Sequence, residues 1–81
     1  MEKKVALIGI IVTDRTKIPK LNEILSANAE YIIGRMGIPH VEEEISLISI
    51  AIDAPADVIS ALSGKIGMLS GISSKVIYAK K

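Results

Sequence analysis

Long apolar runs alternate with stretches of helical periodicity along this sequence. Residues 3–13 are apolar at nearly every position and rich in β-branched side chains, which is typical of a strand covered on both faces. The next segment places apolar residues at the spacing of one helix face, at Ile18, Leu21, Ile24 and Leu25. Pro19 suits the first turn of this helix, because a missing N–H is harmless there, and Asn28 is a residue type that ends helices.

Two further strands are expected in the middle of the chain. Residues 30–38 form the first of them, and Gly34 and Gly37 within it indicate a bulge or the close approach of another backbone. A connection over residues 39–44 then carries an acidic run. Residues 45–52 contain only small polar interruptions, so they too are typical of a strand covered on both sides.

A second helix and a fourth strand complete the pattern. Asp53 and Pro55 are typical of a helix start, and this helix is expected to run to about Leu69. Its apolar stripe consists of Val58, Ile59, Leu62, Ile66 and Leu69. Residues 72–79 are expected to form the last strand.

This order of elements predicts an α+β fold. Two right-handed crossovers interleaved in one sheet give the ferredoxin-like βαββαβ arrangement, a four-stranded antiparallel sheet of order 4-1-3-2 with two helices on one face. The first and third strands then lie in the centre, and their apolar runs are the least interrupted. Because the chain has 81 residues, we expect a single domain over residues 1–81.

The sheet face opposite the helices is also expected to be apolar. In the first strand Val5, Leu7 and Ile11 lie on one face, and the other face carries Ala6, Ile8, Ile10 and Val12. The sequence leaves open which of these faces meets the helices. Because an exposed apolar patch usually marks an interface, we predict a homo-oligomer, either a dimer or a tetramer. If Ile8 and Ile10 lie on the contact face, aspartate at either position should split the assembly.

Composition and charge narrow the classes of function. The absence of cysteine excludes disulfides, thiolate metal sites and a cysteine nucleophile, and it favours the cytoplasm. The net charge of +1 is too small to attract nucleic acid unaided, and no basic recognition helix accompanies the terminal lysines at positions 3, 4, 80 and 81. The apolar run near the N-terminus fits neither a signal peptide nor a membrane span. We therefore expect neither direct nucleic-acid binding nor membrane association.

One rim of the predicted sheet is the best candidate for recognition. The ends of the first two strands should meet the starts of the other two there, which brings mixed charges, two glycines and the one histidine together. Arg35 offers a planar set of donors suited to a carboxylate or a phosphate. Two alternatives stay open: Arg15 or Arg35 pairs with the acidic residues 42–44, or Arg35 is an oligomer contact. The candidate ligand- or partner-binding residues are Asp14, Arg15, Gly34, Arg35, Met36, Gly37, Pro39 and His40.

No catalytic, metal or cofactor site is predicted. His40 has no second histidine or cysteine to complete a metal site, and the consecutive carboxylates at residues 42–44 alternate in direction instead of converging. No serine has a histidine and an acid at the spacing of a catalytic triad, and residues 34–37 are not a phosphate loop or a dinucleotide fingerprint. We therefore expect a protein that is not an enzyme.

Three segments resemble a known small family. They are NEIL at residues 22–25, IGRMGIP at residues 33–39 and ISALSGKIG at residues 59–67. They resemble the iron-only hydrogenase system regulator family, which has an ACT-like fold similar to the C-terminal domain of the nickel-responsive repressor. The resemblance implies regulation near hydrogenase maturation. This chain has TDRT at residues 13–16, where amino-acid-binding ACT domains generally have glycine. The repressor binds metal through several histidines and a cysteine, whereas this chain has only His40.

Together these observations predict a cytoplasmic regulatory module that binds a small ligand or a protein partner and has no DNA-binding domain of its own. The alternative is a non-catalytic, oligomeric accessory subunit that docks onto a larger complex, and a small enzyme is the third possibility. Ligand sensing predicts a pocket at a subunit boundary lined by residues 34–40. The accessory role predicts only a flat surface there.

Overall fold

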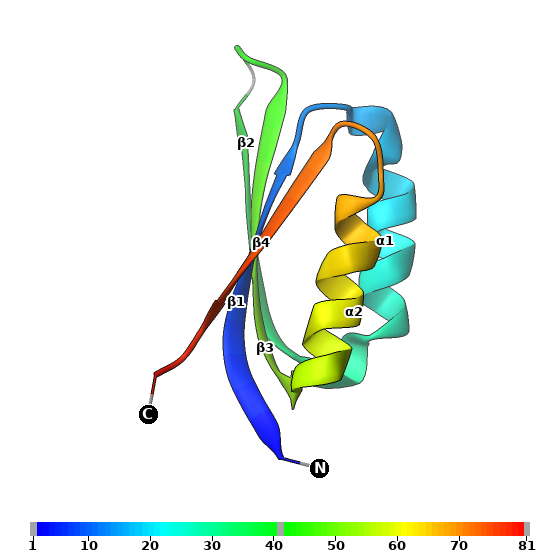
Figure 1. Ribbon diagram of the computed structural model, residues 1–81. Helices are drawn as coiled ribbons and strands as arrows, with labels where there is room; N and C mark the ends of the chain where they lie inside the picture. The colour runs from blue at the N-terminus through cyan, green and yellow to red at the C-terminus, as the bar shows by residue number, and fades with distance from the viewer. Residues whose placement is uncertain (1, 41, 81) are drawn as a thin grey trace.

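The computed structural model describes residues 2–40 and 42–80 as one antiparallel sheet with two helices packed on the same face (Figure 1). The sheet order is β2-β3-β1-β4, which is the predicted order 4-1-3-2 taken from the other edge, so the predicted fold class is confirmed. The strands are β1 (Lys3–Val12), β2 (Ile32–His40), β3 (Ile45–Pro55) and β4 (Ile72–Tyr78), and the helices are α1 (Ile18–Ala27) and α2 (Ala56–Gly67).

The boundaries of α1 and the irregularity in β2 follow the sequence pattern. Pro19 lies in the first turn of α1, and Asn28 caps its C-terminal end through backbone hydrogen bonds to Leu25 and Ser26. The pairing of β2 with β3 shifts register between Ile32 and Gly34, which confirms the expected bulge near the first glycine.

Strand pairing moves two other boundaries away from the prediction. The long β3 continues to Pro55 because Asp53 pairs with Val5 of β1, so Asp53 belongs to a strand and α2 starts only at Ala56. At the other end of the sheet, β2 continues through Pro39 to His40. Proline is tolerated there because β2 is an edge strand.

The core lies between the sheet and the helices, and it settles which face of β1 meets them. Ile8 is fully buried and Ile10 almost so, together with Leu21 and Leu25 of α1. Aspartate at Ile8 or Ile10 would therefore test folding and not assembly. The buried residues are Ala6, Ile8, Ile10, Val12, Leu21, Leu25, Ile48, Ile50, Ile52, Ala54, Ile59, Leu62, Ile66 and Ile72.

Candidate functional site

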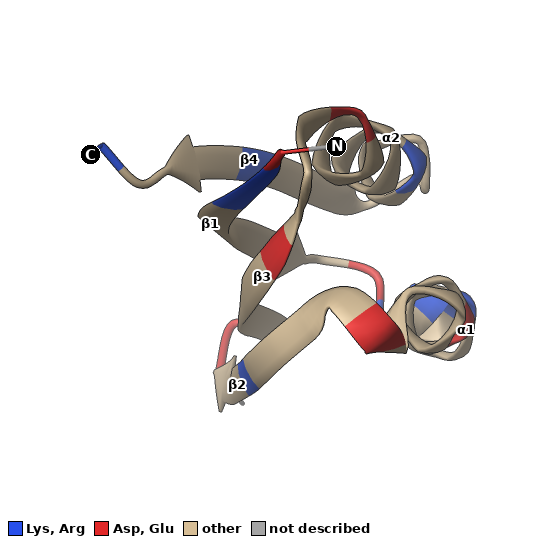
Figure 2. Ribbon diagram, turned by 90° about the horizontal axis from the view of Figure 1, so that it is seen from below, with Lys and Arg blue, Asp and Glu red and all other residues tan. Residues whose placement is uncertain are grey.

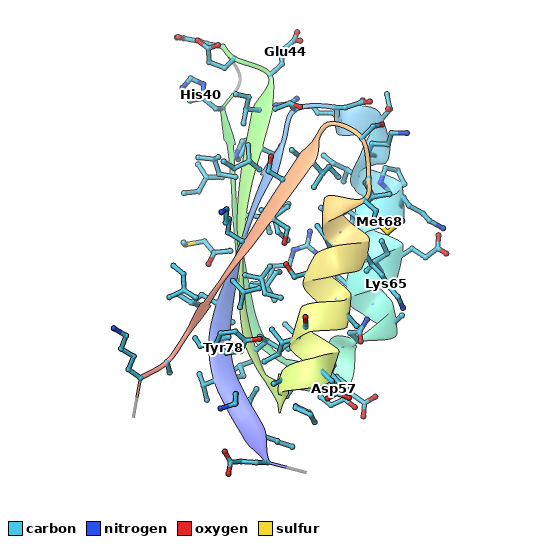
Figure 3. The ribbon with its side chains drawn as sticks, viewed as in Figure 1. His40, Glu44, Asp57, Lys65, Met68 and Tyr78 are labelled. Atoms are coloured by element: carbon cyan, nitrogen blue, oxygen red, sulfur yellow. The ribbon has the colours of Figure 1, made fainter. Side chains whose placement is uncertain are left out.

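The residues predicted for the rim fall into separate places in the structure. His40 lies at the end of β2 opposite Ile45, and Figure 3 shows it with Glu44 at the tip of the β2–β3 hairpin. Arg35 and Met36 instead pair with Ile50 and Ser49 in the middle of β3. Because Arg35 comes five residues before His40, it lies about 16 Å from the rim at the usual rise of a strand.

The rim that remains is small and polar. Thr13, Asp14, Arg15 and Glu44 line an open hollow of about 350 Å³. No ion pair joins Arg15 to the acidic run, because the single ion pair of residues 2–40 and 42–80 is Lys20–Glu23 at 3.6 Å. The proposed pairing of Arg15 with residues 42–44 is therefore not made within the described chain. Val41, which follows His40, lies outside the described residues, as does Lys81.

Asp14 is held in place by its own loop. Its carboxylate accepts hydrogen bonds from the Thr16 hydroxyl at 2.6 Å and from the Thr16 backbone N–H at 3.0 Å. These two bonds, the hydroxyl first, lower the pKa of Asp14 below its ordinary value of 3.8. The carboxylate thus acts as the cap of the short turn Arg15–Lys17.

Arg35 faces the helix side of the sheet, with no acidic partner within the described chain. Its guanidinium Nη2 donates a hydrogen bond to Oδ1 of Asn22 on α1 at 2.8 Å. Met36, the next residue, points to the opposite face because successive side chains of a strand alternate. Gly37 pairs with Ile48, and Pro39 pairs with Ser46. Arg35 and Met36 therefore belong to different surfaces.

The larger surface feature is the sheet face opposite the helices, which we call the open face. Strand register places Leu7 beside Ala51 and Ile77, and Ile11 beside Leu47 and Ser73, on this face. Its large apolar side chains are between 39% and 68% exposed, and they are Val5, Leu7, Ile11, Met36, Ile38, Leu47 and Ile77. Most of the sheet ribbon belongs to uncharged residues (Figure 2). The open face therefore combines a broad exposed apolar surface with a few charged residues, among them Asp53 beside Val5 and Lys75 beside Gly9.

A hollow of about 330 Å³ lies in the middle of the open face, and we call it the central hollow. It exists because Gly9 has no side chain, and Gly9 lies between Ser49 of β3 and Lys75 of β4. A Cβ atom at Gly9 would meet only the backbone oxygen of Lys75, at 3.9 Å, so the space above Gly9 is open. The lining residues are Gly9, Ile10, Ile11, Met36, Ile38, Leu47, Ile48, Ser49, Ser73, Ser74 and Lys75.

The lining of the central hollow is mainly apolar, with a few polar groups at its sides. Lys75 is the charged residue among the described residues that line it, and Ser49 and Ser73 add hydroxyl groups. Sequence reasoning singled out Met36 but missed Gly9 and Lys75. The signal that could have found them is the gap that Gly9 leaves in the apolar open face of β1, but the neighbours of that gap depend on strand register.

The described residues contain little that resembles a built metal or catalytic centre. Within residues 2–40 and 42–80, no three His, Asp or Glu side chains are grouped to hold a metal ion, and no polar or charged residue is buried. In the same residues, no helix has the length and apolar character that crossing a membrane requires. That the protein holds no metal stays a prediction, and elemental analysis of dialysed protein would test it.

Comparisons with known proteins identify a family and a similar solved structure. A family model described as "TM1266-like: Iron-only hydrogenase system regulator, putative" matches residues 4–76. The solved structure of "uncharacterized protein TM1266" from Thermotoga maritima is similar, with a TM-score of 0.94 and 38% sequence identity. The match covers 98% of this chain and 100% of that chain. No curated protein matches the sequence.

Proposed function

Because this chain belongs to the family described as "TM1266-like: Iron-only hydrogenase system regulator, putative", we propose that it is a non-catalytic regulatory module that self-associates through the open face and binds a ligand there. The family match bears out the resemblance that residues 33–39 suggested. The observation that carries the proposal is the open face, which exposes apolar side chains from all four strands. We expect this module to work in the cytoplasm.

The extent of the open face fits a stable dimer. Four strands about 4.8 Å apart, with about 3.3 Å per residue, give the paired part of the sheet a projected area of roughly 500 Å². Protruding side chains make the accessible area of the open face larger than this projected area. The accessible area therefore approaches the roughly 800 Å² that each partner contributes to a standard interface. A second copy of the same face would supply a matching surface in a two-fold dimer.

The free energy available from covering the open face is also sufficient. Its exposed apolar side chains are about half buried already, so complete burial would contribute about 5–10 kcal/mol per copy at about 1.5–3 kcal/mol for each whole side chain. Two copies together would contribute about 10–20 kcal/mol, against an association cost of about 4–15 kcal/mol. The middle of the first range exceeds the middle of the second, which favours association, and the mainly apolar side chains of the open face favour an equally apolar partner.

The central hollow favours ligand binding over a purely structural accessory role. A structural subunit requires only a flat surface, whereas this face has a hollow of about 330 Å³ at its centre. Met36 and Ile38, from the segment predicted to line a ligand pocket, form part of its wall. The accessory role remains the competing proposal.

The mass of the protein in solution tests the self-association directly. We expect sedimentation velocity at micromolar concentration to give a dimer or a tetramer for the wild type. Leu7→Lys should give a monomer with an unchanged circular dichroism spectrum, because Leu7 is 48% exposed and lies on the open face. Met68→Lys, at an exposed apolar residue beside the helices (Figure 3), is the control and should keep the wild-type mass. A monomeric wild type would contradict the proposal.

A cellular experiment separates the regulatory role from the accessory role. In a host that carries an iron-only hydrogenase, the wild-type protein should change hydrogenase transcript or activity, and the Leu7→Lys variant should not. A stable, stoichiometric complex with the hydrogenase itself, without any change in transcript or activity, would instead support the accessory subunit. Met68→Lys again serves as the matched control.

A further inference from the structure

The central hollow differs from the rest of the open face in its chemistry, and a plain apolar contact does not account for it. We propose that it binds a small carboxylic acid with an apolar chain, enclosed between two copies of this protein. The proposal rests on the self-association proposed above and adds the class of ligand. Lys75 would pair with the carboxylate, and the apolar walls would hold the chain.

Lys75 provides the first argument. It lies opposite Gly9 on the open face, and the described residues that line the hollow include no acidic side chain. A second copy that covers this face would remove water from around the ammonium group. A buried charge without a partner is strongly unfavourable, whereas a charge-assisted hydrogen bond to a carboxylate is among the stronger ones in proteins. An anionic ligand group beside Lys75 would supply the partner that the described lining of the hollow lacks.

The shape of the hollow provides the second argument. Across the sheet, the row Met36, Ser49, Gly9 and Lys75 has its two smallest residues in the middle. Stacked sheets lie about 10 Å apart, and facing side chains normally interdigitate to fill the space between them. Gly9 and Ser49 are too small to do so. A second copy alone would therefore leave an unfilled space at the centre of the interface, which is unfavourable in a packed interior.

The walls and the size of the hollow indicate what fills that space. Ile11, Ile38 and Leu47 form apolar walls, and Met36 can adjust its flexible thioether chain to a ligand. A volume of about 330 Å³ lies at the lower end of the range for small-molecule sites. A short unbranched chain with a single carboxylate meets the three conditions of size, apolar walls and one positive charge.

Ligand binding would then promote association, because the ligand neutralises Lys75 and fills the space that dimerisation encloses. This coupling gives the module a way to report a small molecule by a change in assembly. Octanoate is the probe for the carboxylate, and 1-octanol, which has the same chain length and no charge, is its matched control.

Isothermal titration calorimetry with octanoate tests the proposal, and sedimentation velocity is run on the same samples. We expect octanoate to bind the wild type at least about tenfold more tightly than octanol, and to shift the mass toward the larger assembly. Equal binding of the acid and the alcohol, or no binding of octanoate by assembled protein at millimolar concentration, would overturn the proposal.

Two pairs of variants locate the site. Lys75→Met should weaken octanoate binding about tenfold or more and leave octanol binding unchanged, whereas Lys65→Met on α2 should bind both like the wild type. Gly9→Val should abolish binding of both compounds, because it fills an open space without a backbone clash. Gly64→Ala, at an exposed helix position with nothing within 4 Å, is its control. Wild-type affinity for octanoate in Lys75→Met or in Gly9→Val would overturn the assignment.

The mass measurements separate this proposal from the one on which it rests. If the wild type without ligand is a dimer that binds no octanoate, the ligand class is wrong and the self-association stands. If the wild type is monomeric both with and without octanoate, both proposals fail.

Discussion

Gly71 is the residue whose identity the backbone constrains most strongly. Its φ of 77° lies in the left-handed region, and a Cβ atom built on it would lie 2.6 Å from the Cβ atom of Asp14. Its carbonyl oxygen accepts hydrogen bonds from the backbone N–H of Thr13 at 2.7 Å and from the Thr13 hydroxyl at 2.8 Å. The residue before β4 is thereby joined to the loop after β1.

Gly71→Ala should therefore destabilise the fold. We expect a loss of about 1–3 kcal/mol in the free energy of unfolding, from the strained backbone together with the contact at Asp14. Gly64→Ala, which lies inside α2 with open space around it, should be neutral or stabilising by up to about 1 kcal/mol. Urea denaturation measures both values, and equal midpoints for the two variants would contradict the expectation.

The stabilisation of the fold by the Asp14 carboxylate should depend on pH. Its pKa in the folded protein is lowered by the hydroxyl and backbone hydrogen bonds of Thr16, so the ionised carboxylate stabilises the fold. This contribution is fully present above the unfolded pKa, near 3.8, and is lost as the pH falls through the lower folded value. Asp14→Ala should be less stable than the wild type at pH 7. The difference in the free energy of unfolding between the two proteins should become smaller as the pH falls below about 4. A difference in the free energy of unfolding that is unchanged at pH 2.5 would argue against a stabilising role for the charge of Asp14.

At the scale of elements, β2 pairs with the rest of the sheet along one side only. It is an edge strand with a register shift near its start, and Arg35 joins it to α1 by the hydrogen bond to Asn22. Because both side chains are at the surface, this bond holds the strand only weakly.

A double-mutant cycle on Arg35 and Asn22 would measure the strength of this connection. We expect Arg35→Ala and Asn22→Ala each to lower the free energy of unfolding by less than about 1.5 kcal/mol, with a coupling energy of about 0.5–1.5 kcal/mol. Circular dichroism in urea gives these values. A coupling near zero would show that the bond does not persist in solution, and Lys65→Ala on α2 controls for the loss of a surface cation.

The element order and the apolar open face could be predicted from the sequence, but of the residues that line the central hollow only Met36 was singled out. Uninterrupted apolar runs identified β1 and β3 as central strands, and the spacing of Leu21 and Leu25 identified α1. Boundaries that depend on pairing were missed: β3 extends to Pro55 because β1 is there to pair with it. The central hollow was missed for the same reason, since only the register of three strands brings Ser49 and Lys75 to either side of Gly9.

At the scale of the whole molecule, the core and the open face are two apolar surfaces on opposite sides of one sheet. The helices cover the first, which is buried (Figure 1). The second remains exposed in a single copy. The free energy of unfolding should therefore depend on the protein concentration, because association through the open face would stabilise the folded state and not the unfolded state.

The melting temperature should rise with protein concentration. For a dimer that dissociates as it unfolds, each tenfold increase in concentration adds about 1.4 kcal/mol per dimer. Calorimetry over two decades of concentration measures this effect. The Leu7→Lys variant should melt at one temperature throughout the range, and a wild type that behaves in the same way would rule out a stabilising assembly.

The strand order also determines how the chain can fold while it is being synthesised. β1 has its neighbours in β3 and β4, and β2 has its neighbour in β3, so the first two strands leave the ribosome before either has a partner. Both are apolar segments, and unpaired strands of this kind are prone to aggregate and are typical clients of chaperones. The emergence of β3 provides the first partner for both at once. Translation of the segment Ile45–Pro55 is thus the moment at which the nascent chain can begin to form its sheet.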